Sequence, residues 1–357
     1  MFSNNMQAFI LINIYVLLVI NAFILIAIFY QIIKTKIVEK RNSKIMAEIS
    51  SLISKHIEEA GDLLELKAVT NSTYRKMIAI DILIEYSEKD SKSISEIIEE
   101  LKLDLFLINK IKRSPNLKYL RKLAFMKVAS AYEMLLQYSN SEDLDIKYTC
   151  YFGLSMLNVE QYKKYFIIHK LVNSDILSDR IIEILNRIKL KFEEWFELLE
   201  REESEIGKII FLKILTGREE LKTEVYSDRL LKFLQDEKEV RIAAVTAIGS
   251  SKNQIYIDKL YDMFMSENEW EVRVAITKGM TNFDSKLIKD KLIYMIRDEE
   301  WWVRFNAAKA ISSMGEEGIY TLIELSIDKN DEDASALAYY FLNSNKDIYE
   351  TVKNIGG

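Results

Sequence analysis

Residues 236–249 read Asp236-Glu-Lys-Glu-Val-Arg-Ile-Ala-Ala-Val-Thr-Ala-Ile-Gly249, and this segment decides the fold. It recurs as Glu269-Trp-Glu-Val-Arg-Val-Ala-Ile-Thr-Lys-Gly-Met280 and as Asp298-Glu-Glu-Trp-Trp-Val-Arg-Phe-Asn-Ala-Ala-Lys-Ala-Ile-Ser-Ser-Met-Gly315. The repeated valines, Val240, Val272 and Val303, are 32 and then 31 residues apart, and Ala334 follows after another 31. A period of this size is typical of a solenoid of stacked helical repeats.

The start of each repeat carries signals for the beginning of a helix. Asp236, Ser266 and Asp298 stand where a side-chain oxygen would accept hydrogen bonds from the first free N–H groups. Glu239 and Glu269 follow Asp236 and Ser266 by three residues, which is the spacing of a capping box. The sequence therefore predicts that the first helix of each repeat is capped at these positions.

The end of the first helix and a second helix can also be predicted. Gly249 and Gly315 are placed to form left-handed C-caps, and small residues such as Ala243 allow a neighbouring helix to approach closely. Apolar residues then recur at helical spacing over 255–264 and 287–296. Neither helix can bury its apolar face alone, so each pair is expected to stack on its neighbours.

These segments resemble HEAT repeats, in particular the short bacterial variety called PBS-lyase HEAT-like repeats. That pattern has an acidic start, Val-Arg, then Ala-Ala and a closing Leu-Gly or Ile-Gly, and the match is close over 236–315. In weaker upstream copies, Gly207 and Lys147 stand in the place of the arginine. These copies begin near Thr73, Tyr119, Asp145 and Glu205. The resemblance implies an all-α solenoid that holds partners, and it does not imply lyase activity.

The N-terminal 33 residues carry no charged side chain, and most of them are apolar. An apolar helix of about 20 residues spans the hydrocarbon of a bilayer. The basic residues that follow immediately are Lys34, Lys36, Lys40, Arg41 and Lys44. Because positive flanks remain in the cytoplasm, we expect a single-pass protein of the cell membrane with its N-terminus outside and its solenoid cytoplasmic. The predicted divisions are an anchor at 1–33, a juxtamembrane segment and first helix at 34–68, and the repeats at 69–357.

Residues suited to catalysis are scarce in the chain. The two histidines, His56 and His169, are far apart in sequence, and neither lies in a catalytic motif. Cys150 is the single cysteine and is expected to be a small buried residue. The acidic pairs that begin at Asp143 and Asp331 lie at repeat boundaries, where helix capping is a simpler role than metal binding. We therefore predict no enzyme activity, no cofactor and no metal site.

One basic residue recurs at the same place in the three best repeats, as Arg241, Arg273 and Arg304. Stacking should align these side chains as a ladder across the repeats. We interpret the ladder as structural, with each guanidinium bound to an acidic residue of its own or the next repeat. A ligand-binding role is the alternative.

Three of the four tryptophans lie at the start of adjacent repeats. Trp270 and Trp301 each precede the repeat valine by two residues, and Trp302 follows Trp301. Exposed tryptophan is enriched in protein interfaces, so these residues are the predicted partner-binding site. Packing between repeats is the alternative explanation.

A basic run occurs between residues 110 and 127, without an acidic residue inside it. Its members are Lys110, Lys112, Arg113, Lys118, Arg121, Lys122 and Lys127. Such a run is usually a solvated face, but it could also bind an anionic lipid or an acidic partner.

The sequence as a whole favours a membrane-anchored adaptor or scaffold that binds a protein partner, itself a membrane protein or its cytoplasmic domain. Analogy suggests a complex for the synthesis or export of envelope polysaccharide. One rival is a regulatory module that binds a small anionic ligand or lipid through the basic run. A nucleic-acid-processing enzyme is disfavoured by the net charge of −6 and by the mixed charges of the second helices.

Overall fold

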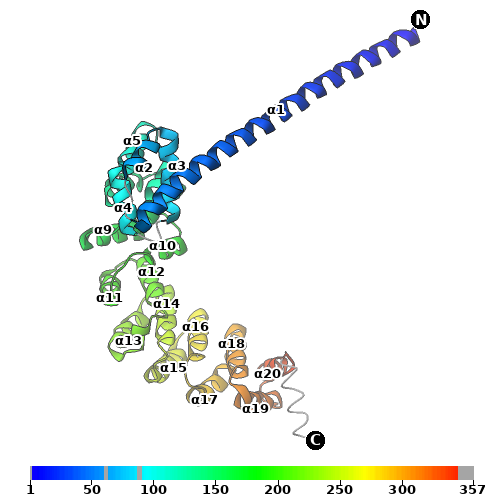
Figure 1. Cartoon of the computed structure of the whole chain (residues 1–357). Helices are drawn as coiled ribbons and strands as arrows, with labels where there is room; N and C mark the ends of the chain where they lie inside the picture. Colours follow the sequence, from blue (N-terminus) through cyan, green and yellow to red (C-terminus); the bar gives the residue numbers. More distant parts are fainter. Residues whose placement is uncertain (1, 60–62, 87–90, 345–357) are drawn as a thin grey trace. The chain divides into compact units, whose positions relative to one another are not determined.

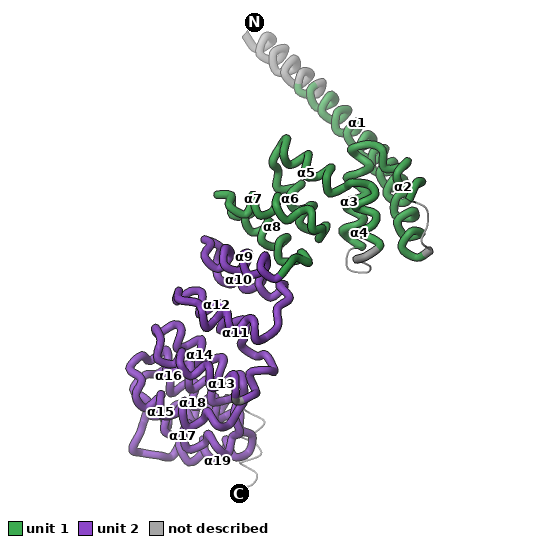
Figure 2. Tube along the Cα trace, turned by 90° about the vertical axis from the view of Figure 1, so that its left-hand side faces the viewer, with its two compact units in different colours: residues 1–160 green, residues 161–357 purple. Residues whose placement is uncertain are grey.

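The chain is helical throughout the part that the structure describes, and this part contains no β-strand. The structure is a computed structural model, and it describes residues 2–59, 63–86 and 91–344. The chain forms two compact units, residues 1–160 and 161–357 (Figure 2). The all-α prediction is therefore confirmed for the described residues, and the helices follow one another in short pairs (Figure 1).

The first unit contains one long helix and a set of short ones. The helices are α1 (Phe2–Glu59), α2 (Leu63–Val69), α3 (Thr73–Tyr86), α4 (Ser91–Glu100), α5 (Leu103–Arg113), α6 (Leu117–Phe125), α7 (Tyr132–Tyr138) and α8 (Leu144–Ser155). The weaker sequence copies at Thr73, Tyr119 and Asp145 fall in α3, α6 and α8. Helices α6 and α8 pack against each other, as repeat neighbours should.

The second unit contains the best repeats. Its helices are α9 (Gln161–Val172), α10 (Ser178–Leu185), α11 (Phe192–Arg201), α12 (Glu205–Leu215), α13 (Glu224–Leu230), α14 (Lys238–Ser250), α15 (Ile257–Ser266), α16 (Trp270–Met280), α17 (Ser285–Met295), α18 (Trp301–Ser312), α19 (Gly315–Ser326) and α20 (Glu332–Ser344). Helices α12, α14, α16, α18 and α20 pack in succession and form one layer, which we call the first-helix layer (Figure 1).

The first-helix layer is held together by small and apolar side chains. Val240, Ala244 and Val272 are fully buried within it. A Cβ atom added to Gly249 would lie 3.0 Å from the Cα atom of Gly279, so these two glycines let α14 and α16 approach closely. Gly249 therefore has a packing role and lies inside α14, contrary to the predicted C-cap. Gly315 has a left-handed backbone, with φ of 65°, but it is the first residue of α19, and Ser313 is the C-cap of α18.

The predicted helix caps differ from those in the structure. Helices α14, α16 and α18 begin later than expected, and Glu237, Glu269 and Glu300 are their N-cap residues. Ser266 ends α15 instead, and its hydroxyl donates to carbonyls of that helix. Asp298 still accepts a backbone hydrogen bond, from the N–H of Glu300, but from a position outside the helix. Asp298 lies outside the helix because its carboxylate binds both its own loop and Arg273 of the preceding repeat.

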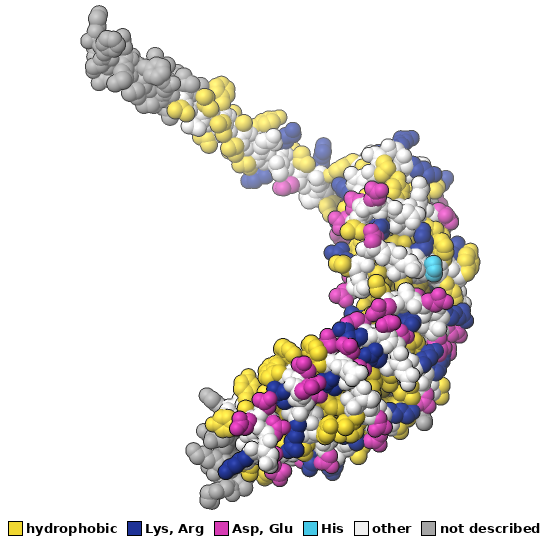
Figure 3. Space-filling model, turned by 180° about the vertical axis from the view of Figure 1, so that it is seen from behind, with side chains coloured by type: hydrophobic (Ala, Val, Ile, Leu, Met, Phe, Trp, Pro, Cys, Tyr) yellow, Lys and Arg dark blue, Asp and Glu magenta, His cyan; other side chains and the backbone are white. Residues whose placement is uncertain are grey.

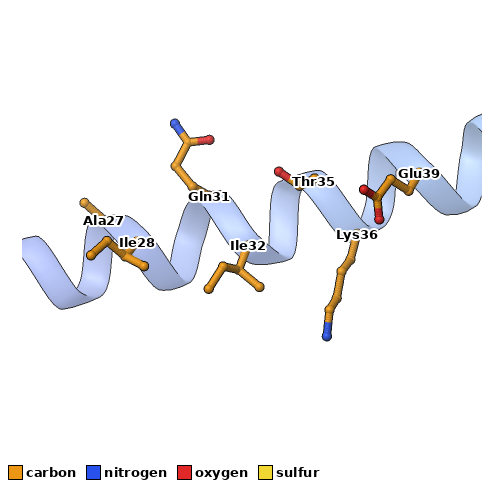
Figure 4. A pocket seen from close by; sticks show the side chains of 7 residues that line it. All are labelled: Ala27, Ile28, Gln31, Ile32, Thr35, Lys36 and Glu39. Atoms are coloured by element: carbon orange, nitrogen blue, oxygen red, sulfur yellow. The ribbon is translucent and has the colours of Figure 1, made fainter. Parts of the chain in front are cut away.

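Helix α1 runs without a break through the predicted boundary between residues 33 and 34. Figure 4 shows the change along it, from Ala27, Ile28 and Ile32 to Lys36 and Glu39 within a few turns. Ile49 and Ile53, farther along the helix, are fully buried, since α1 packs there against α2, α3 and α4. By length and composition, Ile20–Glu58 is a candidate to cross a membrane.

Candidate functional site

The three repeat arginines occupy the fourth position of α14, α16 and α18 and join each repeat to the next. Arg241 donates to both carboxylate oxygens of Glu267, with Nε and Nη2 each 3.0 Å away. Arg273 does the same to Asp298, at 2.9 and 3.0 Å. The third nitrogen of each guanidinium, Nη1, donates to carbonyls in the loop before its own helix. Each arginine therefore ties two loops together, which is a structural role.

The ladder extends one repeat upstream through a lysine. Lys208 is the fourth residue of α12, and its Nζ lies 2.7 Å from the Oδ2 of Asp236. The repeat pattern of this weak copy predicted Gly207 in the arginine position, one residue too early. The error arose because Gly207 takes the place of the buried repeat valine and Lys208 that of the arginine. This copy therefore lacks both residues of the Val-Arg pair that marks the three best repeats.

Trp301 and Trp302 lie at the start of α18 and belong to an exposed aromatic cluster. Trp301 stacks on Phe305 at 5.0 Å between ring centroids, and Trp302 meets Trp301 edge-on at 4.7 Å. Phe305 also contacts Phe341 of α20, at 5.2 Å. The exposed fractions are 44% for Trp301 and 51% for Trp302, so the indoles are available to a partner. We call Trp301, Trp302, Phe305, Tyr340 and Phe341 the aromatic cluster.

Trp270 begins α16 and is 37% exposed, but within the described residues it has no ring contact with the aromatic cluster. The next residue, Glu271, accepts a hydrogen bond of 3.0 Å from Lys238 of α14. This bond lowers the pKa of the Glu271 carboxyl below its ordinary value. Figure 3 shows hydrophobic side chains on the part of the second unit that contains α16, α18 and α20. The three predicted tryptophans therefore share one layer, but only two of them touch.

A groove lies beside the aromatic cluster, between α18 and α20. Its volume is about 420 Å³, within the range of sites that hold a side chain or small ligand. The lining residues are Trp301, Arg304, Phe305, Asp333, Ala336, Leu337 and Tyr340. Phe305 and Tyr340 were not predicted as site residues from the sequence. Phe305 follows Trp301 by one helical turn, which was an available signal, whereas Tyr340 requires knowledge of the packing of α20 on α18.

Glutamates without ion pairs recur along the same edge of the layer. Glu237, Glu269 and Glu300 are the N-cap residues of α14, α16 and α18, and Glu332 is the first residue of α20. Among the described residues, no lysine or arginine lies within ion-pair distance of these four carboxylates. Helix N-termini stabilise negative charge, which explains why the acids can remain unpaired. The edge that carries the tryptophans is consequently acidic.

The basic run lies in the first unit, at the end of α5 and along α6. Lys112, Arg113, Lys118, Arg121 and Lys127 are exposed and have no carboxylate within ion-pair distance among the described residues. Lys110 is half-buried, and its Nζ lies 5.8 Å from the ring centroid of Phe106. Lys122 differs from the others, because it pairs with Asp81 of α3 and burial lowers its pKa. Lys122 is therefore a packing residue and not part of an open basic surface.

The cysteine and the acidic pairs that were considered for catalysis or metal binding have structural roles. Cys150 is fully buried in α8, and desolvation raises the pKa of its thiol to about 12. Asp143 caps α8 by accepting hydrogen bonds from the N–H groups of Asp145 and Ile146, which confirms the capping interpretation. Asp331 accepts one from the N–H of Ala334. Within the described ranges, no group of three or more His, Cys, Asp or Glu side chains is placed to hold a metal ion.

A comparison with protein families supports the repeat assignment in part of the second unit. Residues 257–343 match the family of HEAT repeats. This range contains α15 to α19 and nearly all of α20, together with the groove and the tryptophans. The HEAT-like repeat predicted from residues 236–315 is thereby supported in the second unit. The search of curated proteins gave no match to the chain. HEAT repeats are in general protein-interaction scaffolds. The exposed aromatic cluster lies within the matched range.

Proposed function

We propose that this protein is a membrane-anchored adaptor whose HEAT-like repeats bind a protein partner. The observation that carries the proposal is the exposed aromatic cluster at the edge of the first-helix layer. Clustered, solvent-accessible tryptophans supply large contact areas and are enriched among residues that dominate binding energy. The ladder and the buried glycine contact make the layer a rigid base for this surface.

The anchoring part of the proposal rests on α1. Large apolar side chains on this helix, such as Phe23, Leu25 and Phe29, are 65–70% exposed in the isolated chain. Exposed apolar surface of this extent requires a lipid or protein environment. A bilayer satisfies this requirement for the uncharged segment, and the basic residues from Lys34 onward would lie on the cytoplasmic side. By analogy we propose an envelope polysaccharide assembly as the kind of complex.

The topology can be tested with reporters fused after Gly357. We expect a reporter that functions only in the cytoplasm to be active, since the positive flank should retain the solenoid there. A reporter that functions only outside the cytoplasm should be inactive at the same position. The reverse pattern would overturn the proposed orientation, and recovery of both fusions in the soluble fraction would overturn the anchor.

The binding surface can be tested with Trp302→Ala. We expect less partner to be captured from detergent-solubilised membranes, while the free energy of unfolding changes by about 1 kcal/mol or less. Capture is measured by quantitative mass spectrometry and stability by thermal melting. Tyr320→Ala is the matched control, because Tyr320 is 54% exposed on α19 and lies outside the aromatic cluster. Equal capture by the Trp302 variant and the unmodified chain would remove Trp302 from the interface.

A further inference from the structure

Arg304, the last arginine of the ladder, is bound differently from Arg241 and Arg273. Arg304 forms an ion pair with Asp333, with Nη2 3.0 Å from Oδ2, and donates from Nη1 to the carbonyls of Asp298 and Glu299. Its Nε is buried and meets no acceptor within the described part of the chain. In Arg241 and Arg273 the same atom donates to a carboxylate. The third repeat therefore leaves one buried donor unused.

The register of the acidic partner explains the difference. Glu267 and Asp298 stand three residues before α16 and α18, so their carboxylates meet the preceding arginine with both oxygens. Asp333 is instead the second residue of α20 and supplies one oxygen. The loop acids before α20 have other roles, since Asp328 pairs with Arg297 and Asp331 caps the helix. The incomplete rung is a consequence of how α20 begins.

The unused donor belongs to a residue that lines the groove between α18 and α20. The groove has aromatic walls on both helices, from Trp301 and Phe305 on one and Tyr340 on the other. The Nε atom itself is buried, so an occupant of the groove does not reach it. Arg304 contributes to the lining as the ion-pair partner of Asp333.

The charges around the groove favour a cationic occupant. Acidic runs lie next to the starts of both helices, with Asp298 to Glu300 just before α18 and Asp331 to Asp333 across the start of α20. Three arginines, Arg273, Arg297 and Arg304, pair with four of these six carboxylates. Glu300 and Glu332 remain without an ion pair among the described residues. A lysine or arginine side chain is attracted both to such carboxylates and to the faces of tryptophan and tyrosine rings.

We propose that this groove binds a basic segment of the protein partner. A lysine or arginine of the segment lies against the Trp301 and Tyr340 rings, where Glu300 and Glu332 stand at the starts of the two helices that form the groove. The inference rests on the proposed function and specifies the chemistry of the partner. Cytoplasmic segments next to membrane spans are rich in lysine and arginine, so a membrane-protein partner would present such a segment.

The test uses the full chain in detergent and two labelled ten-residue peptides. In one peptide lysine and arginine alternate with leucine, and in the other glutamate replaces every basic residue. We expect the basic peptide to bind and the acidic peptide not to bind in fluorescence anisotropy. Glu300→Gln with Glu332→Gln should weaken binding of the basic peptide about tenfold, since two exposed charge interactions are lost.

The control removes the same charge elsewhere in the first-helix layer. Glu205→Gln with Glu237→Gln changes acids at the starts of α12 and α14 that have no ion pair within the described part of the chain and lie outside the groove. This double variant should bind the basic peptide within about twofold of the unmodified chain, because screened charges at a distance contribute little. Equal weakening by both double variants, or preference for the acidic peptide, would overturn the inference.

A competition assay separates the remaining explanations. If the basic peptide fails to displace a partner whose capture depends on Trp302, this inference fails and the proposed function stands. If capture does not depend on Trp302, the proposed function itself fails.

Discussion

Arg273→Leu is expected to lower the free energy of unfolding by on the order of 3–5 kcal/mol, the usual cost of breaking a buried ion pair from one side. The side chains of Arg273 and Asp298 are each only 8% exposed. Removal of the guanidinium leaves the buried Asp298 carboxylate without its cation. The carbonyls of Glu267 and Asn268 also lose the donor that Arg273 supplies. Urea denaturation of the full chain in detergent, followed by circular dichroism at 222 nm, measures the loss.

Arg297→Leu is the matched control for this prediction. Arg297 also pairs with an aspartate, at 2.9 Å from Asp328, but its side chain is 47% exposed. Exposed pairs contribute about 0–1 kcal/mol, so this variant should unfold at nearly the same urea concentration as the unmodified chain. Similar losses in the two variants would show that burial of the Arg273 pair does not determine its contribution.

Trp195→Ala should have an effect of the same size through a different mechanism. Trp195 is the one tryptophan outside the predicted binding site, and it is 1% exposed in α11, with Phe211 of α12 at 6.3 Å between ring centroids. Truncation of a fully buried aromatic side chain opens a cavity and costs about 3–5 kcal/mol. Thermal melting should therefore separate Trp195→Ala clearly from Trp302→Ala. A small loss at Trp195 would mean that the packing between α11 and α12 can close the cavity.

Much of the fold could be predicted because the repeat signal is local. The valine spacing of 31 and 32 residues located α14, α16, α18 and α20 without any knowledge of their contacts. The exact starts of the helices could not be predicted in the same way. Asp298 binds an arginine 25 residues away and the N–H of Glu300 together, so its position is set by the neighbouring repeat as well as by its own helix.

The candidate site was predictable where exposure follows from helix position and not where it depends on packing. Trp302 is exposed because it occupies the same helix-surface position as Glu239 in α14. The groove, by contrast, exists only because α20 places Tyr340 and Asp333 opposite α18. Lys122 shows the same limit within the basic run. Its charge is like that of its neighbours, but a contact with Asp81, distant in sequence, removes it from the open surface.

The unbroken course of α1 has a mechanical consequence for the proposed adaptor. With residues 1–33 in a bilayer, the helix continues for 15 residues from Lys34 to the first fully buried position, Ile49, about 22 Å at 1.5 Å per residue. A glycine-rich linker of that length would let the first unit change its orientation freely, whereas a continuous helix is a semi-rigid spacer. The first unit is then held at a set distance from the lipid. Any contact that the first unit makes with another membrane protein is thereby confined to that distance.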